Sequence, residues 1–124
     1  MGLDMYLYRK NKDEKEAEEV AYWRKANQIR KWIVDNCGYD NEANCEFFPL
    51  TKQQLEKLTD DCDKAIENRD MAPILFPTSS GFFFGNTEYN ELYFDKLKET
   101  SRMIKEVLND TDFSTQEIAY YEWW

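Results

Sequence analysis

Hydrophobic and polar residues alternate near both ends of this chain. The opening stretch MGLDMYLYRK puts Leu3, Met5 and Leu7 on one side, with acidic and aromatic residues between them. The closing stretch IAYYEWW alternates in the same way. A period of two is typical of a half-buried strand, so we predict a strand in each stretch. We place the last strand at a sheet edge, with Tyr120 and Trp124 packed inward or, alternatively, offered to a second copy of the chain.

A helical period follows the first strand and predicts a long helix over residues 16–36. Two apolar stripes lie on nearly opposite faces of it: Tyr22, Ala26, Ile29 and Ile33 on one, and Val20, Trp23, Asn27 and Val34 on the other. An exposed helix usually has one such stripe, so we expect this helix to be covered on both sides. Arg24, Gln28 and Lys31 form a positively charged strip beside the second stripe.

Cap and turn residues place the next elements. Gly38 is positioned to end the first helix, and CEFFPL predicts a short strand. Thr51 and Gln54 have the spacing of a capping box at the start of a second helix. Cys62 lies on the core stripe of that helix, where we expect a small buried hydrophobe. Residues 70–80 contain two prolines and predict a loop.

Three consecutive phenylalanines lie between glycines in PTSSGFFFGNTEYNE. A short apolar run bounded by glycines predicts a strand, with Phe82 and Phe84 on one face and Phe83 on the other. Thr87 is a good cap for a third helix that reaches residue 108. Both sides of the triple-ring segment are therefore expected to be covered.

These elements predict the fold class. Their order is β-α-β-α-β-α-β, with connections short enough for a single compact domain over residues 1–124. We predict an α+β fold in which a small β-sheet of about four strands packs with three helices. A chain of 124 residues with 42% hydrophobic and 33% charged residues can bury such a core.

The charge balance narrows the classes of partner. The chain carries 16 basic and 25 acidic residues, a net charge of −9. Binding to nucleic acid backbones requires concentrated Lys and Arg, so we do not expect it. The net charge is compatible with a small anion bound at a local basic cluster and with a basic protein partner. An acidic composition is also a common aid to solubility.

The histidine and cysteine content narrows the chemistry. The chain has no histidine, which excludes Ser-His and Cys-His nucleophile pairs, imidazole bases and His-ligated zinc. Its three cysteines form no CxxC pair, and neither a signal peptide nor an apolar run of membrane length is present. We therefore predict reduced thiols, a cytoplasmic location and no membrane association.

Clustered carboxylates are the remaining candidates for catalysis or metal binding. Asp60, Asp61 and Asp63 diverge around a predicted helix, and residues 109–117 lack the central Gly and final Glu of a calcium loop. We interpret these groups as solvated acids and predict no cofactor, metal site or catalytic residue. An enzyme that uses carboxylate, Lys or Tyr chemistry is kept as a third hypothesis.

Two segments are candidates for ligand binding. YWRKANQIRKW offers guanidinium and indole groups for an anion or nucleotide, although it also fits a solvated helix face. TSSGFFFG offers hydroxyls and backbone amides without being a Walker loop, although it also fits an ordinary loop, strand and cap. The predicted ligand-binding residues are Trp23, Arg24, Asn27, Gln28, Lys31, Ser80, Phe82, Phe84, Thr87 and Tyr89.

Four blocks of the sequence carry a resemblance to a known family. MGLDMYLY, EVAYWRKANQIRKW, CEFFPLTKQQLEKLTDDC and PTSSGFFFGNTEYNELYFDKLKET resemble a family of small proteins from phages and bacterial prophage regions. Members of that family often carry His where Arg30 stands here. The resemblance implies a phage setting in a host bacterial cytoplasm, which favours counter-defence, takeover or lysogeny functions.

The leading hypothesis is a phage-type, non-catalytic protein that sequesters a small, nucleotide-like anionic signal. The alternative is an acidic protein inhibitor that occupies a basic surface of a host enzyme. The alternative predicts binding that weakens steeply with salt, whereas the first predicts a concave site where the first helix meets the triple-ring segment.

Overall fold

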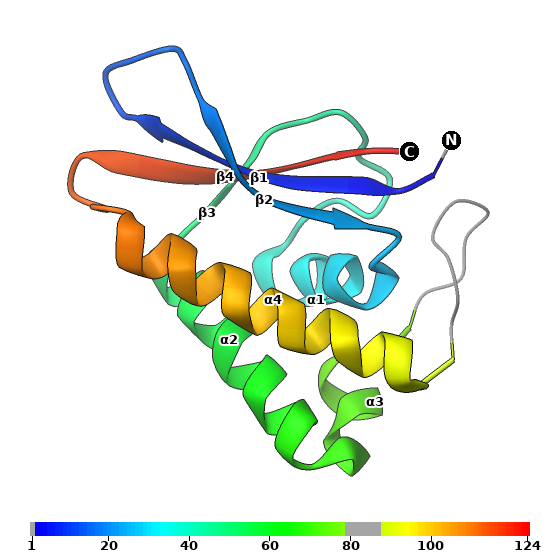
Figure 1. Ribbon diagram of the computed structural model, residues 1–124. Coiled ribbons are helices and arrows are strands. Elements are labelled where there is room, and N and C mark those ends of the chain that lie inside the picture. The colour runs from blue at the N-terminus through cyan, green and yellow to red at the C-terminus, as the bar shows by residue number, and fades with distance from the viewer. Residues whose placement is uncertain (1, 79–87) are drawn as a thin grey trace.

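The computed structural model describes residues 2–78 and 88–124. They form an α+β fold, as predicted, with a four-stranded antiparallel sheet in the order β2-β1-β4-β3. The strands are β1 (Asp4–Asn11), β2 (Glu18–Arg24), β3 (Phe48–Leu50) and β4 (Gln116–Trp123). Figure 1 shows the helices packed against one face of this sheet, while the opposite face carries no helix.

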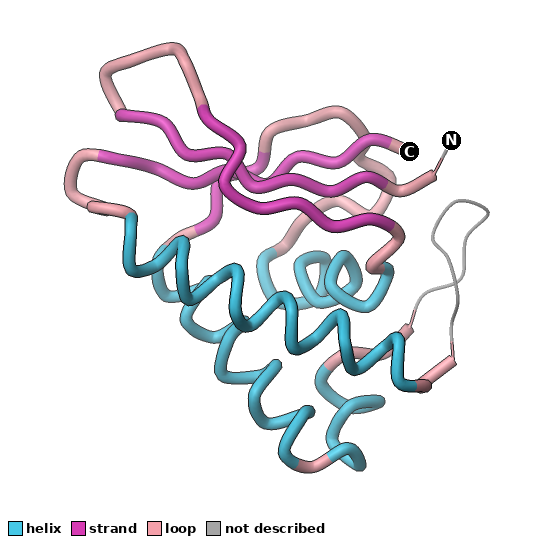
Figure 2. Tube along the Cα trace, in the orientation of Figure 1, coloured by secondary structure: helices cyan, strands magenta, loops and turns pink. Residues whose placement is uncertain are grey.

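The helices form the second layer of the fold. They are α1 (Asn27–Cys37), α2 (Lys52–Glu67), the short 3-10 turn η1 (Arg69–Met71), α3 (Ala72–Leu75) and α4 (Glu91–Asp110). Figure 2 shows α2 and α4 side by side beneath the sheet. No helix within the described ranges is long and apolar enough to cross a membrane.

The predicted helix over residues 16–36 is wrong in its first half. The chain turns back at residues 12–17, and Glu18–Arg24 pairs with β1 as an antiparallel hairpin in which Tyr22 lies opposite Tyr6. Within this strand Ala21 and Trp23 are buried while Tyr22 is exposed, which is a period of two. Aromatic and β-branched residues favour strands, and pairing with β1 decides between two periods that this short stretch satisfies equally.

The second half of the predicted helix is confirmed as α1. Four successive residues at its start, from Asn27 to Arg30, are buried, so this turn is covered on every side, as expected. Lys25, just before α1, has a left-handed φ of 55°, which separates the strand from the helix. The element order is therefore strand, strand, helix rather than the simple alternation that we predicted.

Several local predictions are confirmed. The alternating residues of β1 bury Leu3, Met5 and Leu7 completely, and Cys62 is buried on α2. The capping box of α2 is present: the Thr51 hydroxyl accepts from the Gln54 amide at 3.1 Å, and the Gln54 side chain accepts from the Thr51 amide at 2.8 Å.

Three other predictions need correction. Strand β4 is not at an edge, because it pairs with both β1 and β3. The expected loop over residues 70–80 contains most of η1 and all of α3. Helix α4 begins at Glu91 with Asn90 as its cap, three residues later than we predicted. The predicted cap Thr87 and the triple-ring segment lie outside the described residues.

The core fills the space between the sheet and the helices. Its polar groups are paired across the layers: the Trp23 indole N–H donates to the Thr100 hydroxyl at 2.8 Å, and the Trp32 indole donates to the Asp61 carboxylate at 2.9 Å. Each bond satisfies an indole that would otherwise be buried without a partner. These contacts join β2 to α4 and α1 to α2.

A buried ion pair fixes one end of β4. The Nε atom of Arg30 lies 2.9 Å from both carboxylate oxygens of Glu122, and the two side chains are 2% and 0% exposed. The remaining guanidinium nitrogens donate to the Asn41 side chain and backbone at 2.8 and 2.7 Å. Glu122 also accepts from the Tyr120 hydroxyl and the Trp124 indole. The loop after α1 is thereby tied to the sheet.

Candidate functional site

The sheet face opposite the helices is covered by aromatic rings. Alternation along β1, β2 and β4 turns Tyr6, Tyr8, Tyr22 and Tyr121 outward, and Phe47 joins them from the segment before β3. Neighbouring rings contact one another, with centroids 5.2 Å apart for Tyr6 and Tyr22, 6.2 Å for Tyr6 and Tyr121, and 4.8 Å for Phe47 and Tyr121. We call these five residues the aromatic face.

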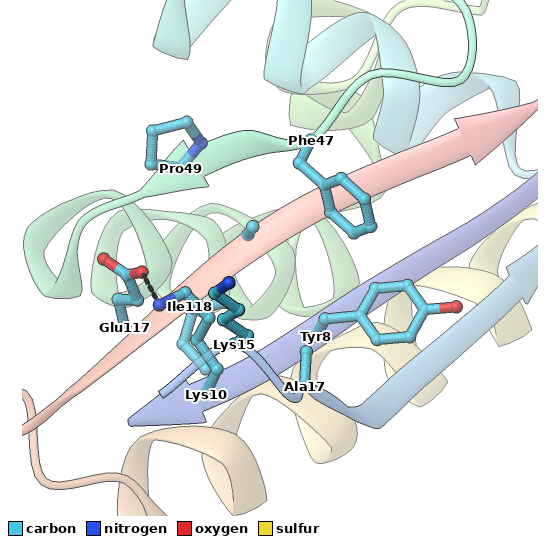
Figure 3. Close-up of a pocket in the computed structure, with 9 residues that line it drawn as sticks. Tyr8, Lys10, Lys15, Ala17, Phe47, Pro49, Glu117 and Ile118 are labelled. Carbon is cyan, nitrogen blue, oxygen red and sulfur yellow. Dashed lines mark ion pairs between the residues drawn. The ribbon is translucent and has the colours of Figure 1, made fainter. Parts of the chain in front are cut away.

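A pocket of about 390 Å³ is hollowed into one end of the aromatic face. Figure 3 shows the side chains that line it. We call it the sheet pocket, and its lining residues are Tyr8, Lys10, Lys15, Ala17, Phe47, Pro49, Glu117, Ile118 and Ala119. Most of the lining is apolar. Its polar groups are the ammonium groups of Lys10 and Lys15, the Glu117 carboxylate and the Tyr8 phenol.

The local sequence explains how these groups meet. Tyr8 and Lys10 are outward positions of β1, while Glu117 and Ala119 are outward positions of the paired strand β4. The small Ala119 side chain opposite Tyr8 leaves the floor of the hollow open. Pro49 fits on β3 because this strand is at the sheet edge, where a missing backbone N–H costs no ladder bond.

Hydrogen bonds to α1 and to the end of β4 hold the loop that carries Phe47. Arg30 binds Asn41 through two hydrogen bonds, and the Cys45 amide donates to the Glu122 carbonyl at 2.9 Å. Asn44 exchanges hydrogen bonds with the backbone of Trp124. Phe47 itself is 64% exposed, so its ring is available to a ligand on a supported loop.

The two lysines of the sheet pocket differ in their partners. The Nζ atom of Lys10 lies 2.9 Å from the Glu117 carboxylate, an ion pair visible in Figure 3. Lys15 makes neither a hydrogen bond nor an ion pair within the part of the chain that the structure describes. The pocket therefore offers one uncompensated positive charge beside aromatic rings.

Local contacts raise the pKa values of Tyr6 and Tyr121 on the aromatic face. Partial burial and the nearby Asp4 carboxylate raise the pKa of Tyr6. A hydrogen bond with Cys45, together with partial burial, raises the pKa of Tyr121. These two rings can therefore stack on a planar group and donate O–H bonds without adding negative charge near neutral pH.

The groups that line the sheet pocket are of the kinds that hold small molecules. Across residues 2–78 and 88–124, no group of three or more Cys, Asp or Glu side chains is placed to hold a metal ion. The pocket instead pairs apolar surface with a few convergent polar groups, which is the usual character of a small-molecule site.

Three of the predicted ligand-binding residues are committed elsewhere. Trp23 points into the core and binds Thr100, because it belongs to a strand and not to an exposed helix face. Asn27 is buried at the start of α1. Lys31 pairs with Asp35 one turn further along α1, with 2.8 Å between Nζ and Oδ1.

Two predicted residues, Arg24 and Gln28, do come together in a second, smaller hollow. It has a volume of about 180 Å³ between the ends of β2, α1 and α4. We call it the helix-end hollow, and its lining residues are Arg24, Lys25, Gln28, Glu88, Asn90, Leu92, Tyr93 and Lys96. Tyr89 is close in space, since its ring centroid lies 4.9 Å from that of Tyr93. Ser80, Phe82, Phe84 and Thr87 lie outside the described residues.

Sequence reasoning missed the sheet pocket. The alternation of β1 did place Tyr6 and Tyr8 on the face opposite the buried leucines. Exposed aromatic rings on a strand were therefore the one sequence signal that pointed to a binding surface there. The pocket itself requires the β1–β2 hairpin and the segment before β3, which are far apart along the chain. With Glu18–Arg24 interpreted as helix, that outer face could not be assembled.

Comparison with known proteins adds no identity. No protein-family model, no curated protein and no solved structure matches this chain.

Proposed function

We propose that this protein is a non-catalytic binding protein that captures a small, nucleotide-like anion in the sheet pocket. The observation that carries the proposal is an apolar hollow in which Tyr8 and Phe47 stand beside the ammonium group of Lys15. Rings suit a planar base, and the ammonium suits a phosphate or another acidic group.

Size and charge favour a small ligand over a polymer. A volume of about 390 Å³ falls within the range of about 300–1,000 Å³ found for small-molecule sites. The net charge of −9 opposes the backbone of a long nucleic acid, whereas a single nucleotide needs only local positive charge.

The rings and the ion pair suggest how a nucleotide would lie. Tyr8 and Phe47 meet edge to face, with centroids 5.7 Å apart and an interplanar angle of 67°. A flat base can therefore stack on one ring and contact the edge of the other. The Glu117 carboxylate can accept an N–H from the base edge, while Lys15 binds the anionic group.

The biological setting completes the proposal. The resemblance to small phage and prophage proteins favours a role in the cytoplasm of a bacterial host. A protein that sequesters a nucleotide signal there would act in counter-defence by lowering the free concentration of that signal.

Isothermal titration against a panel of cyclic and linear nucleotides tests this function. We expect saturable binding of at least one member of the panel. Tyr8→Ala should weaken it by about tenfold or more, because stacking on an aromatic ring contributes about 1–3 kcal/mol per base. Tyr22→Ala, at the far end of the aromatic face, is the matched control and should leave affinity unchanged. Absence of heat from every nucleotide at millimolar concentration would contradict the proposal.

The acidic-inhibitor alternative is favoured by one separate observation. Tyr22, Phe47 and Trp123 are 38%, 64% and 61% exposed, and exposed rings are enriched at protein interfaces. A host protein bound there should be lost in a Tyr22→Ala, Trp123→Ala double variant. Nucleotide affinity should be retained by the same variant, so the two functions give opposite results.

A further inference from the structure

We infer that the helix-end hollow is a second binding site, specific for a compact oxyanion of the phosphate type. Its lining unites the end of β2, the start of α1 and the first turn of α4 around a space of about 180 Å³. The inference does not depend on the function proposed for the sheet pocket, because the two sites share no lining residue.

Cationic side chains outnumber acids in this hollow. Arg24, Lys25 and Lys96 line it, against the single carboxylate of Glu88. One guanidinium nitrogen of Arg24 is held by Asp4 at 3.0 Å on the outer side of the strand. A local excess of positive charge is unexpected on a chain of net charge −9, and it is the feature that an anion would recognise.

The two lysines of the hollow have no ion pair among the described residues. Neither Lys25 nor Lys96 has an ion-pair partner in the two stretches that the structure describes. The remaining residues, Met1 and residues 79–87, include no Asp or Glu side chain. No other carboxylate side chain of this chain is therefore left to pair with them.

The backbone holds Lys25 in place beside α1. Its amide donates to the Leu3 carbonyl at 2.7 Å, and its side chain packs against Gly2, where an added Cβ would lie 3.0 Å from Cε. A glycine at position 2 thus leaves room for the aliphatic part of the lysine. Lys25 lines the hollow, and these contacts of its backbone and aliphatic side chain involve no acid.

The polar groups around these cations also suit an anion. Ala26 occupies the N-cap position of α1 and has no side-chain oxygen, so this positive helix end lacks the usual cap. Gln28, almost completely buried, donates its amide to the Tyr93 carbonyl at 3.3 Å and so joins α1 to α4 across the hollow. The walls are therefore fixed relative to each other.

The volume limits the ligand to a compact group. About 180 Å³ is smaller than the roughly 300 Å³ at which pockets begin to enclose drug-sized molecules. Phosphate or pyrophosphate has the appropriate size and charge. The same chemistry could be supplied by the phosphate of a nucleotide whose base lies outside, and the experiment must separate these two sources.

Titrations with inorganic phosphate and pyrophosphate, at constant ionic strength set with chloride, provide the test. The wild-type chain should bind pyrophosphate, with an affinity that decreases as salt increases. A Lys25→Gln, Lys96→Gln double variant should lose about tenfold or more in affinity. Lys52→Gln, Lys98→Gln changes the net charge equally at exposed positions outside the hollow and should bind like the wild type.

Three outcomes would overturn the inference: no pyrophosphate binding by the wild-type chain, equal binding by the Lys25, Lys96 variant, or an equal loss in the control variant. A nucleoside monophosphate and Tyr8→Ala identify the source of the phosphate. Pyrophosphate bound by Tyr8→Ala with unchanged affinity supports an independent oxyanion site. Nucleotide binding lost in the Lys25, Lys96 variant but kept in Tyr8→Ala would support this hollow and contradict the sheet pocket.

Discussion

The two faces of the sheet use the same residue types for different purposes. Tyr120 and Tyr121 are neighbours on β4, yet Tyr120 is completely buried with its hydroxyl 2.6 Å from Glu122, while Tyr121 belongs to the aromatic face. Trp23 and Tyr22 divide in the same way on β2. The comparison teaches that the direction of a ring, set by strand parity, decides whether it stabilises the fold or remains accessible to a ligand.

The helix-covered face depends on completed polar contacts, and the open face depends on shape and local charge. On the covered face Trp23 and Tyr120 each have a hydrogen-bond partner. On the open face the rings contact one another and border a hollow with Lys15, which has no ion-pair partner among residues 2–78 and 88–124. Substitutions on the covered face should therefore reduce stability, whereas those on the open face should reduce binding.

The largest effect is expected from Glu122→Ala. This change leaves the buried Arg30 without its counter-ion, so the free energy of unfolding should fall by about 3–5 kcal/mol. Urea denaturation followed by circular dichroism measures it. Glu117→Ala, which breaks an ion pair on the open face, should cost about 1 kcal/mol or less. An Arg30→Met, Glu122→Met double variant should recover much of the loss, and a loss below 1 kcal/mol for Glu122→Ala would contradict the expected role of the buried pair.

The second comparison uses adjacent residues of β1. Leu7→Ala opens a cavity in the core and should cost about 2–5 kcal/mol. Tyr8→Ala removes a ring from the open face and should cost about 1 kcal/mol, the range of strand preferences. Nucleotide titration should give the opposite ranking: Tyr8→Ala should lower the affinity for nucleotide, and Leu7→Ala, measured on folded protein, should leave it unchanged. If both variants changed the free energy of unfolding and the nucleotide affinity by equal amounts, the two faces of the sheet would not differ in role.

A smaller effect is expected when a single hydroxyl is removed from β4. Tyr120→Phe leaves one buried oxygen of Glu122 with fewer donors and should reduce the free energy of unfolding by about 1–3 kcal/mol. Tyr121→Phe should remain within about 0.5 kcal/mol of the wild type, as is usual for surface positions. The same urea titrations compare the two variants, and a larger loss for Tyr121→Phe would reverse the assignment.

Alkaline pH should weaken the covered layer gradually. Burial raises the pKa of the Cys37 thiol from 9.0 to about 11. Burial, with the charge of Glu122, also raises that of the Tyr120 phenol. The unfolded chain releases these protons at lower pH than the folded chain, so the stability present below about pH 9 should be lost as pH rises toward 11. Urea midpoints between pH 8 and about 11 measure this decline, which should be shallower in Cys37→Ser; a rising midpoint would contradict it.

The fold was predictable where one period dominated a long stretch. The core residues of β1 and the buried Cys62 of α2 followed directly from their spacing, and the capping box located the start of α2. Glu18–Arg24 was not predictable in this way, because seven residues satisfy both periods and only pairing with β1 decides between them. The start of α4 shifted because Asn90, and not Thr87, supplies the cap.

The sites were less predictable than the fold. Arg24 and Gln28 were expected near an anion, and they do line a hollow, but Lys96 reaches it from a helix far along the chain. The burial of Arg30 could not be read from local spacing, because its partner Glu122 lies 92 residues away. The sheet pocket combines β1, β4 and the segment before β3, so no local spacing could reveal it.

The central claim is that the open face of the sheet, not the covered one, receives the ligand. Amide NMR spectra recorded during titration with the best-binding nucleotide test it most directly. The account predicts that the largest shifts occur around Tyr8, Ala17, Phe47 and Ala119, and that Tyr8→Ala needs about tenfold or more nucleotide to produce them. Shifts absent from these residues, or found only around Lys25 and Lys96, would contradict it.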